Sequence, residues 1–247
     1  MLKENQDAFG RAMYDYLVSG MRNPHIEEII EREDGYIDTA GGPAVYFSEY
    51  RRWPPVEKKS LRYARGRVLD IGCGAGRHSL YLQGKGLDVV GIDNSPLAIE
   101  VCKQRGLTHA EVISISQISS KLGVFDTVLM LGNNFGLFGS YDGAKRLLKK
   151  FSGITSKKGR IIASSNDVYK TDNPEHLKYH EINRKRGRMA GQIRLRARYH
   201  QYATPWLDYL MVSREEMENI LDGTDWRVNR FIDSAGPFYM AIIDKKK

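Results

Sequence analysis

Cysteine is scarce in this chain of 247 residues, which contains two. Cys73 and Cys102 show no paired spacing of the kind found in metal or redox motifs, so we expect both to be small packing residues. A reducing, cytoplasmic location is the corresponding expectation. No constellation of residues in the sequence predicts a metal site.

Long apolar runs are absent as well. No stretch of about 20 apolar residues occurs, so we expect neither a transmembrane helix nor a membrane partner. Charged residues run through the first 20 positions, which argues against a signal peptide. Hydrophobic residues nevertheless make up 41% of the chain, enough for a sizeable core. The length fits one α/β domain with additions, or at most two small domains.

Negative charge is in deficit, and the formal net charge is +8. A basic balance suits a nucleic acid, an acidic small substrate, or solubility alone. The excess concentrates in a stretch with seven basic residues and no acidic one: Arg184, Lys185, Arg186, Arg188, Arg194, Arg196 and Arg198. Apolar residues alternate with the last three arginines, which predicts a half-buried strand with one basic face.

Glycine is concentrated in residues 67–82, RVLDIGCGAGRHSLYL, and the rest of the chain is organised around this stretch. An apolar strand runs into Asp70, glycines follow at positions 72, 74 and 76, and a helix begins at Arg77. Glycine reaches backbone angles closed to other residues, and the free N–H groups of a helix start face a ligand. The spacing departs from the dinucleotide fingerprint G-x-G-x-x-G, because the third glycine comes one residue early.

Two further strands support a nucleotide-type site. The strand at 89–92 ends at Asp93, 23 residues after Asp70 and close to the offset of about 20 at which an acid meets a ribose hydroxyl. An acid-led strand, FDTVLMLGNN, occupies residues 125–134. Together with the D-x-G-x-G-x-G pattern, these features resemble the class I S-adenosylmethionine-dependent methyltransferases. The alternative is an ordinary βαβ turn with incidental glycines.

The alternation of strands and helices predicts an α/β fold with a doubly wound, mainly parallel sheet. The resemblance implies seven strands in a Rossmann-like methyltransferase fold. We expect residues 1–55 to form an N-terminal helical and aromatic lid segment, with helices at 1–19 and 25–32. Residues 56–247 would form the cofactor-binding domain, with a β insertion at 166–212 after the fifth strand.

The remaining pattern completes this picture. Five aromatic residues between positions 36 and 53 either pack the N-terminal segment onto the domain or cover the site. We expect strands at 111–115 and 160–164, and a hairpin partner for the basic strand at 204–212. A helix at 213–221 has a capping box formed by Ser213 and Glu216, and two strands, 226–232 and 238–243, follow.

Residue roles follow from the resemblance. Asp70 and the glycine turn would hold the amino acid end of S-adenosylmethionine, and Asp93 would accept both ribose hydroxyls. Many family members carry an acid after the third strand, where this chain has Ser116 and Gln117 instead. The full set of implied cofactor-binding residues is Asp70, Gly72, Cys73, Gly74, Gly76, Asp93, Asn94, Ser116, Gln117 and Leu131.

The implied reaction is in-line displacement of a methyl group from a sulfonium, with S-adenosylhomocysteine as product. Such a site chiefly aligns donor and acceptor, and a base is needed only when the acceptor arrives protonated. Candidates are Asn133 and Asn134 as hydrogen-bonding groups, with a turn role as the alternative. His180, in the segment HLKYHEIN, is the candidate base, and a solvated loop is its alternative.

The leading interpretation is a methyltransferase acting on a small-molecule acceptor, an acidic one if the strand at 194–198 faces it. One alternative is an RNA methyltransferase that uses the basic residues 184–198. Another is a non-catalytic protein that binds S-adenosylmethionine. The glycine spacing disfavours a nicotinamide-dependent oxidoreductase, and the oligomeric state has no sequence signature.

Overall fold

A computed structural model describes residues 1–39 and 41–246. It contains one sheet in the order β11-β12-β7-β6-β3-β4-β5 and a second in the order β10-β8-β1-β2, with β9 paired to β8. Ala40 of the aromatic-rich segment and Lys247 of the basic tail lie outside the described residues. The chain divides into two compact units, which are described separately. Unit 1 comprises Met1–Trp53, Leu69–Gln117 and Arg194–Leu207, and unit 2 comprises Pro54–Val68, Ile118–Ile193 and Asp208–Lys247.

The predicted doubly wound, mainly parallel seven-stranded sheet is confirmed. The strand β3 (Arg67–Ile71) is followed on one side by β4 (Asp88–Asp93) and β5 (His109–Val112). On its other side come β6 (Phe125–Met130) and β7 (Thr155–Asn166). The strand order therefore reverses at β3, and ligands of open α/β sheets bind outside the carboxyl ends of the strands at such a switch point.

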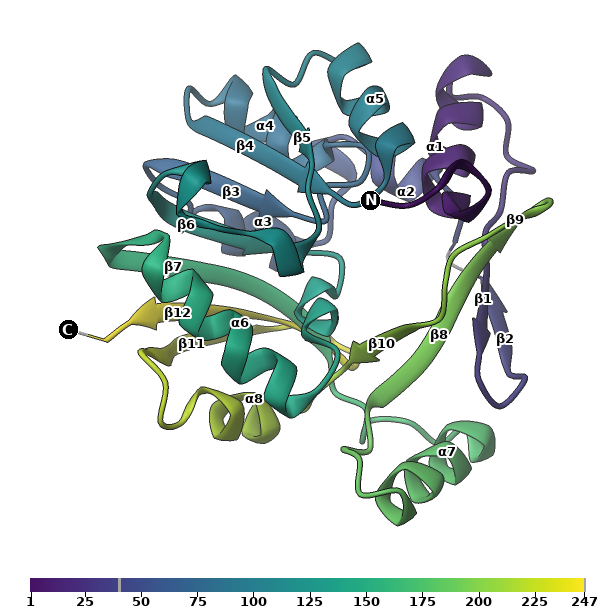
Figure 1. The fold of residues 1–247 in the computed structure, drawn as a ribbon, viewed down its shortest axis with the longest axis vertical. Helices are drawn as coiled ribbons and strands as arrows, with labels where there is room; N and C mark the ends of the chain where they lie inside the picture. The colour runs from purple at the N-terminus through teal and green to yellow at the C-terminus, as the bar shows by residue number, and fades with distance from the viewer. Residues whose placement is uncertain (40, 247) are drawn as a thin grey trace. The chain divides into compact units, whose positions relative to one another are not determined.

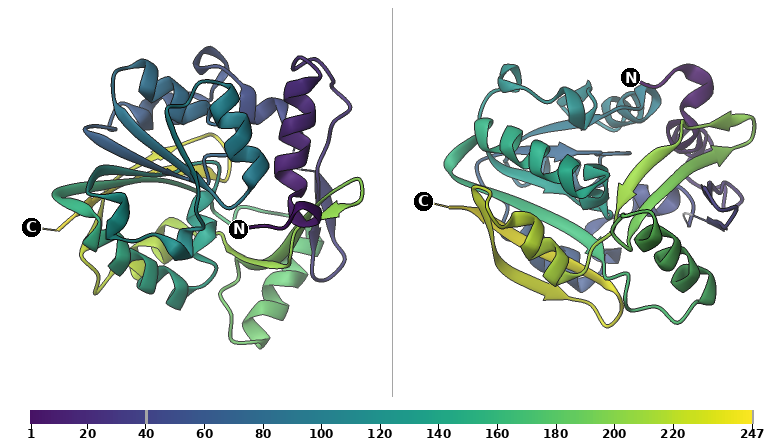
Figure 2. Two further views of the ribbon diagram at one scale, coloured as in Figure 1. Left: turned by 45° about the horizontal axis from the view of Figure 1, so that its top comes forward. Right: turned by 60° about the horizontal axis from the view of Figure 1, so that its bottom comes forward.

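Unit 2 contains the antiparallel end of this sheet. Strand β12 (Phe238–Lys245) pairs antiparallel with β7 and with β11 (Trp226–Asp233). Helices α6 (Tyr141–Gly153) and α8 (Arg214–Leu221) lie together over these strands, as Figures 1 and 2 show. Helix α3 (Pro55–Leu61) also contacts β11 and β12. The predicted capping box at the start of α8 is confirmed.

Unit 1 contains the glycine turn and the helices around it. Helix α4 (Arg77–Gly84) follows the turn, and α5 (Pro96–Gln104) follows β4. Helix α1 (Ala8–Val18) packs against α5, and the two are seen side by side in Figure 1. The Ser95 hydroxyl accepts the Ala98 N–H at 2.9 Å and so caps α5.

The helix expected at residues 25–32 is wrong. Residues Ile29–Arg32 form strand β1, which pairs antiparallel with β2 (Ile37–Thr39) and β8 (Gln192–Tyr199). The apolar positions 26, 29 and 30 suit a helix, but burial alternates instead, with Ile26 and Glu28 buried and Glu27 and Ile29 exposed. Pairing with a strand more than 160 positions away in the chain overrides the local pattern.

The basic strand predicted around residues 193–199 is confirmed as β8. Its expected hairpin partner at 204–212 is divided into β9 (Tyr202–Ala203) and β10 (Leu207–Leu210). Helix α7 (Pro174–Lys185) precedes it and contains the HLKYHEIN segment, which is therefore not a loop. The short elements are α2 (Ala44–Phe47) and the 3₁₀ helices η1 (Glu4–Gln6), η2 (Tyr50–Arg52), η3 (Ile115–Gln117), η4 (Ser120–Leu122) and η5 (Asn134–Phe138).

The aromatic residues of the N-terminal segment pack within unit 1. The ring of Tyr50 stacks on that of Tyr81 in α4 at a centroid distance of 4.4 Å. The ring of Trp53 lies edge-on to His78 at 4.7 Å, and its indole N–H donates to the Ser48 carbonyl at 2.8 Å. These contacts favour the packing interpretation of this segment, since stacked and edge-on rings contribute beyond the area they bury.

We predict that Asp7→Ala destabilises the protein by about 2–3 kcal/mol. Asp7 is buried, and its two carboxylate oxygens accept the N–H groups of Gly10 and Leu97, both at 3.1 Å. The substitution leaves both donors without that acceptor and removes the link between α1 and α5. Urea unfolding measures the loss, with exposed Glu4→Ala as the control that stays within about 0.5 kcal/mol. Equal stability of the two variants would contradict this account.

Candidate functional site

The glycine turn has the strained geometry that its sequence predicts. Gly72, Gly74 and Gly76 have φ angles of 68°, 55° and 77°, in the left-handed region that favours glycine. The N–H groups of Gly72 and Cys73 both donate to the Ile92 carbonyl, at 2.8 and 3.1 Å. The turn is therefore fastened to the end of β4 by its own backbone.

The two sides of this turn differ. A Cβ added at Gly76 would lie 2.9 Å from Cys102 Sγ, so that side packs against α5. A Cβ at Gly74 would meet a single heavy atom of the described residues within 4 Å, the Met13 Sδ at 3.7 Å. The Gly74 side is the open one, and it is where a ligand would lie against the main chain.

The two cysteines belong to the packed side. Both are buried and free, with their sulfur atoms 3.8 Å apart. The Cys102 thiol donates to the Gly74 carbonyl at 3.0 Å. The hydrogen bond between the two thiols, together with burial, raises the pKa of Cys73. An elevated pKa leaves little thiolate at Cys73, and the burial of both side chains is that of packing groups.

Asp70 lies at the end of β3 and is buried. The Ser79 hydroxyl in the first part of α4 donates to its Oδ2 at 2.6 Å. Burial raises the pKa of Asp70, while His78 and Ser79 act in the opposite direction. Ser79 had no role in the sequence prediction, yet it fixes the orientation of this carboxylate.

Asp93 lies at the end of β4, beside the turn. Its Oδ2 accepts the Gly74 N–H at 3.1 Å and its Oδ1 accepts the Ser95 N–H at 3.0 Å. Burial raises the pKa of Asp93 to about 6, and these two N–H groups lower it. The next residue, Asn94, is exposed, and its carbonyl accepts the Leu2 N–H at 3.0 Å.

Ser116 and Gln117 are exposed and lie in η3. The third strand of the βα pattern, β5, ends at Val112, three residues earlier than predicted. Its pairing with β4 runs from His109 to Val112, and Val112 lies opposite Asp93, the last residue of β4. The Gln117 Oε1 accepts the Ser114 N–H at 3.1 Å, which shapes the loop after β5. Unit 1 thus brings together Asp70, the glycine turn, Asp93, Asn94, Ser116 and Gln117.

Unit 2 contains the other candidates, beginning with the end of β6. Leu131 is buried, and Asn133 has a φ of 66°, uncommon for a residue with a side chain. The Asn133 N–H donates to Ser164 Oγ at 2.8 Å, and its carbonyl accepts the Tyr209 hydroxyl at 2.6 Å. Asn134 begins η5.

The side-chain amide of Asn133 has an oxygen that accepts no hydrogen bond from the described residues. Its Oδ1 is buried and has no hydrogen-bond partner among the described residues. A buried amide oxygen without a donor is unfavourable by about 1–3 kcal/mol. The left-handed backbone of Asn133 and its unsatisfied side-chain oxygen are the features of unit 2 that most indicate a ligand-binding position.

His180 is buried on α7, and its ring lies 6.2 Å from that of Tyr169. Asn183, on the next turn of the same helix, is fully buried and donates to the Ala190 and Gln192 carbonyls at 3.0 and 2.8 Å. The segment therefore packs as a structural helix, and the role of His180 as a base stays a prediction.

A family model described as a methyltransferase domain matches residues 68–159. Across the whole chain, the fold is similar to that of a SAM-dependent methyltransferase from Bacteroides fragilis in complex with S-adenosyl-L-homocysteine. That structure has a TM-score of 0.84 and 23% identity, and the match covers 100% of this chain and 98% of that one. Residues 68–159 thus form a methyltransferase domain, and the chain as a whole has the fold of an S-adenosylmethionine-dependent methyltransferase.

Curated relatives match this chain over shorter stretches. A 2-heptyl-1-hydroxyquinolin-4(1H)-one methyltransferase from Mycobacteroides abscessus is 40% identical over 70 residues, 26% of this chain and 31% of that protein. A tRNA U34 carboxymethyltransferase from a Geobacter species is 31% identical over 121 residues, 43% of this chain and 38% of that protein. The aligned regions thus span about a third of these relatives' length.

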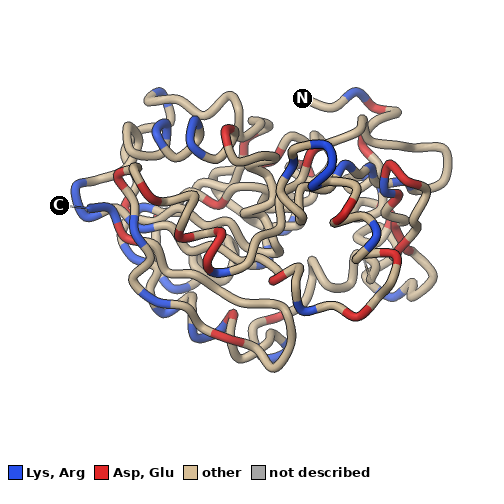
Figure 3. Tube along the Cα trace, turned by 90° about the horizontal axis from the view of Figure 1, so that it is seen from below, with Lys and Arg blue, Asp and Glu red and all other residues tan. Residues whose placement is uncertain are grey.

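The basic face of β8 is partly neutralised. The Arg196 guanidinium donates two hydrogen bonds to the Glu31 carboxylate of β1, at 2.8 and 3.0 Å, and Arg198 donates a third at 3.1 Å. The Arg196 guanidinium also lies 4.6 Å from the centre of the Trp206 ring. Figure 3 shows Lys and Arg interspersed with Asp and Glu along the trace.

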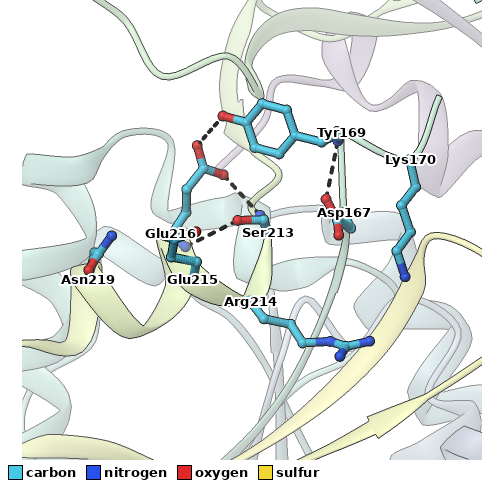
Figure 4. A pocket seen from close by; sticks show the side chains of 8 residues that line it. All are labelled: Asp167, Tyr169, Lys170, Ser213, Arg214, Glu215, Glu216 and Asn219. Carbon is cyan, nitrogen blue, oxygen red and sulfur yellow. Dashed lines mark hydrogen bonds between the residues drawn. The ribbon is translucent and has the colours of Figure 1, made fainter. Parts of the chain in front are cut away.

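A cavity of about 550 Å³ lies at the start of α8 (Figure 4). Tyr169 and Ser213 both point toward Glu216, and the Tyr169 hydroxyl donates to its carboxylate at 2.7 Å. Arg214 extends away from Glu216 and pairs with Asp233 at 2.6 Å. The polar groups are thus paired with one another, and capping of α8 accounts for them.

Within residues 1–39 and 41–246, no group of three or more His, Cys, Asp or Glu side chains is arranged to hold a metal ion. In that same part of the chain, no helix combines the length and apolar character needed to cross a membrane.

We predict that Asn133→Gly raises the free energy of unfolding by about 1–3 kcal/mol, because it removes the buried, unsatisfied side-chain oxygen and glycine adopts the left-handed conformation freely. Asn133→Ala removes the same oxygen but should be about 1 kcal/mol less stable than the glycine variant, since a Cβ is disfavoured in the left-handed region. Urea unfolding of both variants checks the difference. A glycine variant less stable than the alanine variant would show that the amide, and not the backbone, holds this turn.

Proposed function

We propose that this chain transfers the methyl group of S-adenosylmethionine to a small-molecule acceptor. The observation that carries the proposal is the Asp93 carboxylate, which lies at the end of β4 and is joined to the open glycine of the turn at 3.1 Å. A carboxylate in this place offers two acceptor oxygens to the two hydroxyls of a ribose.

The residues present fit the cofactor. Gly74 leaves its outer side open, as close approach of a ligand to the backbone requires, and the buried Asn133 Oδ1 lacks a donor among the described residues. Asp70 and the turn would hold the amino acid end, Asp93 the ribose, and Asn94, Ser116 and Gln117 the adenine. S-adenosylmethionine supplies an electrophilic methyl group on a sulfonium, and this chain's residues then bind and orient the acceptor.

A small-molecule acceptor fits better than RNA. Two of the arginines in the basic stretch already share the carboxylate of Glu31, so less positive charge is left for a phosphate backbone. The quinolinone methyltransferase shows that a similar domain serves small molecules in another protein. We propose a small-molecule acceptor for the chain as a whole, with residues 1–55 as the lid segment and residues 166–212 as the substrate-side insertion.

Asn133 and Asn134 are proposed as hydrogen-bonding groups toward the ligand, and His180 remains the weaker candidate, as a base. The two free, buried cysteines support a reducing, cytoplasmic location.

The direct test uses S-adenosylmethionine that carries a labelled methyl group, protein-free metabolite extracts, and a purified RNA fraction as the competing substrate. We expect label to appear in a small molecule, with S-adenosylhomocysteine formed in equal amount. Label in RNA would support the alternative acceptor. Binding of S-adenosylhomocysteine without label transfer to either fraction would support a non-catalytic binding protein.

We predict that Asp93→Ala weakens S-adenosylhomocysteine binding by about 1–3 kcal/mol, because the two ribose hydroxyls lose their acceptor. Isothermal calorimetry measures the change. The matched control is Glu111→Ala on the neighbouring strand β5, an exposed acid whose loss should leave affinity unchanged. An Asp93→Ala protein that is folded and binds as tightly as the control would remove the ribose assignment.

The raised pKa of Asp93 predicts a pH dependence of binding. With a pKa of about 6, Asp93 is ionised at pH 7.5 and mostly protonated at pH 5. Because hydroxyl donors favour the ionised form, affinity for S-adenosylhomocysteine should fall roughly tenfold between these pH values. The Asp93→Asn variant should bind more weakly and show a nearly flat profile. A wild-type profile as flat as the variant's would mean that Asp93 does not face the ligand.

A further inference from the structure

A second carboxylate, Glu28, lies inside unit 1 and has no part in the site described above. It immediately precedes β1, and its side chain is 0% exposed. Ile26 and Ile30, two positions away on either side, pack into one apolar cluster with residues of α1 and β8. Because side chains alternate along an extended strand, Glu28 points to the same inner side as these two isoleucines.

The partner across the sheet is an aromatic residue. The β1–β8 ladder pairs Ile29 with Arg198 and Ile30 with Ala197, so its continuation places Glu28 opposite Tyr199. Tyr199 belongs to the same apolar cluster. Burial raises the pKa of Tyr199 to about 12, with contributions from Asp15 and Glu28, so its phenol keeps its proton.

The Tyr199 hydroxyl proton is already donated to a group other than Glu28. The Tyr199 hydroxyl donates to Asp15 Oδ2 at 3.2 Å, and the Arg11 guanidinium pairs with Asp15 Oδ1 at 2.8 Å. A phenol has one proton to donate, so it cannot serve Glu28 at the same time. Among the described residues, neither oxygen of the Glu28 carboxylate has a hydrogen-bond partner.

An ionised carboxylate in this state is unfavourable, because water has been removed and no donor replaces it. Burial raises the pKa of Glu28 to about 7, and the neighbouring Glu27 raises it further. The N–H of its own backbone lowers the pKa, but it lies outside hydrogen-bond geometry with the carboxylate. A group with a pKa near neutrality both accepts and releases a proton readily. Such a costly arrangement, unsupported by the fold, is typical of a group that waits for a ligand.

We propose that Glu28 is the carboxylate that binds the acceptor, that the acceptor is a primary or secondary amine, and that Glu28 takes the proton which the amine carries in water. This inference rests on the proposed methyltransferase function. An ammonium group suits the position because it supplies both the donors and the opposite charge that the buried carboxylate lacks.

The step balances as follows. The ammonium gives one proton to Glu28, which leaves a neutral amine with a free lone pair and a neutral carboxylic acid. The lone pair forms the new nitrogen–carbon bond while the sulfur–carbon bond breaks and its electron pair stays on sulfur, leaving a thioether. The product is a methylated ammonium, and Glu28 returns its proton to water when the product leaves.

The acceptor reaches Glu28 only if neighbouring groups move. The residues that lead into Glu28 from α1, Ser19 to His25, are exposed and belong to no helix or strand. None of them is a member of the apolar cluster, whereas β1 is held by β2 and β8 on both edges.

The first test needs no acceptor. A carboxyl group whose folded pKa lies above its ordinary value of 4.5 adds stability that is complete below pH 4.5 and is lost as the pH rises through about 7. Glu28→Gln abolishes this loss, so we expect its Tm to exceed that of the wild type by about 4 °C or more at pH 8 and by less than about 1 °C at pH 4. Glu111→Gln, an exposed acid on β5 that does not contribute to the pKa of Glu28, is the control with no pH-dependent difference.

The second test measures transfer of labelled methyl groups to a panel of primary and secondary amines, with phenols and carboxylic acids of the same carbon skeletons alongside. We expect label on amines alone. On those amines, Glu28→Gln should have kcat/KM at least about 100-fold below the wild type, with binding of S-adenosylhomocysteine within about twofold. Glu28→Asp, which keeps the charge but withdraws it by one methylene, should show an intermediate loss.

Three results would overturn the proposal: label on the oxygen acceptors or on no compound of the panel, full activity of Glu28→Gln, or a Tm difference that does not change with pH. Failure of the wild-type protein to bind S-adenosylhomocysteine would instead overturn the proposed function, so the two failures are distinguishable.

Discussion

The Asp93 carboxylate is the interaction on which the site depends. It accepts one N–H from the glycine turn and one from the start of α5, at 3.1 and 3.0 Å, and so joins the ends of two strands to a helix. Asp7 makes a similar link between two helices, since it caps α1 and accepts the Leu97 N–H of α5. The two acids lie close enough that Asp7 contributes to the raised pKa of Asp93. The turn therefore has its shape before any ligand arrives, which reduces the ordering cost of binding.

Much of this arrangement could be predicted from the sequence, because its signals are local. The bounds of α5 follow from a serine cap, a proline at the first helical position and an apolar face, and they match the structure to the residue. Likewise, the glycine turn follows from three glycines between an apolar strand and a helix. The rule that parallel strands present their carboxyl ends at one edge then brings Asp70 and Asp93 to the same turn, although no contact between them is visible in the sequence.

The parts that could not be predicted depend on distant pairing. The segment IEEIIER has isoleucines at helical spacing, and nothing local reveals that β8 will pair with it. The same holds for the support of Asn133, whose backbone is held by Tyr209 from a segment 76 positions away. Tyr209 in turn fits only because position 136 is glycine, where a Cβ would lie 2.2 Å from the ring. Such contacts have no periodicity, so only the tertiary structure shows them.

The misassigned strand has a functional consequence. With helical spacing, Glu28 would have lain on a polar face, where an acid needs no explanation. The strand instead turns it inward, into a cluster whose nearest phenol and arginine are both engaged with Asp15. Asp93 and Glu28 are thus both carboxyl groups with raised pKa values, but they differ in kind. Asp93 accepts hydrogen bonds from backbone N–H groups and can accept further ones from neutral hydroxyls. Neither carboxylate oxygen of Glu28 has a hydrogen-bond partner among the described residues, so a cationic donor would suit it. Under the two proposals, Asp93 accepts the neutral hydroxyls of the cofactor's ribose and Glu28 binds the ammonium of the acceptor, so the difference in hydrogen bonding between the two carboxylates matches a difference between their ligands.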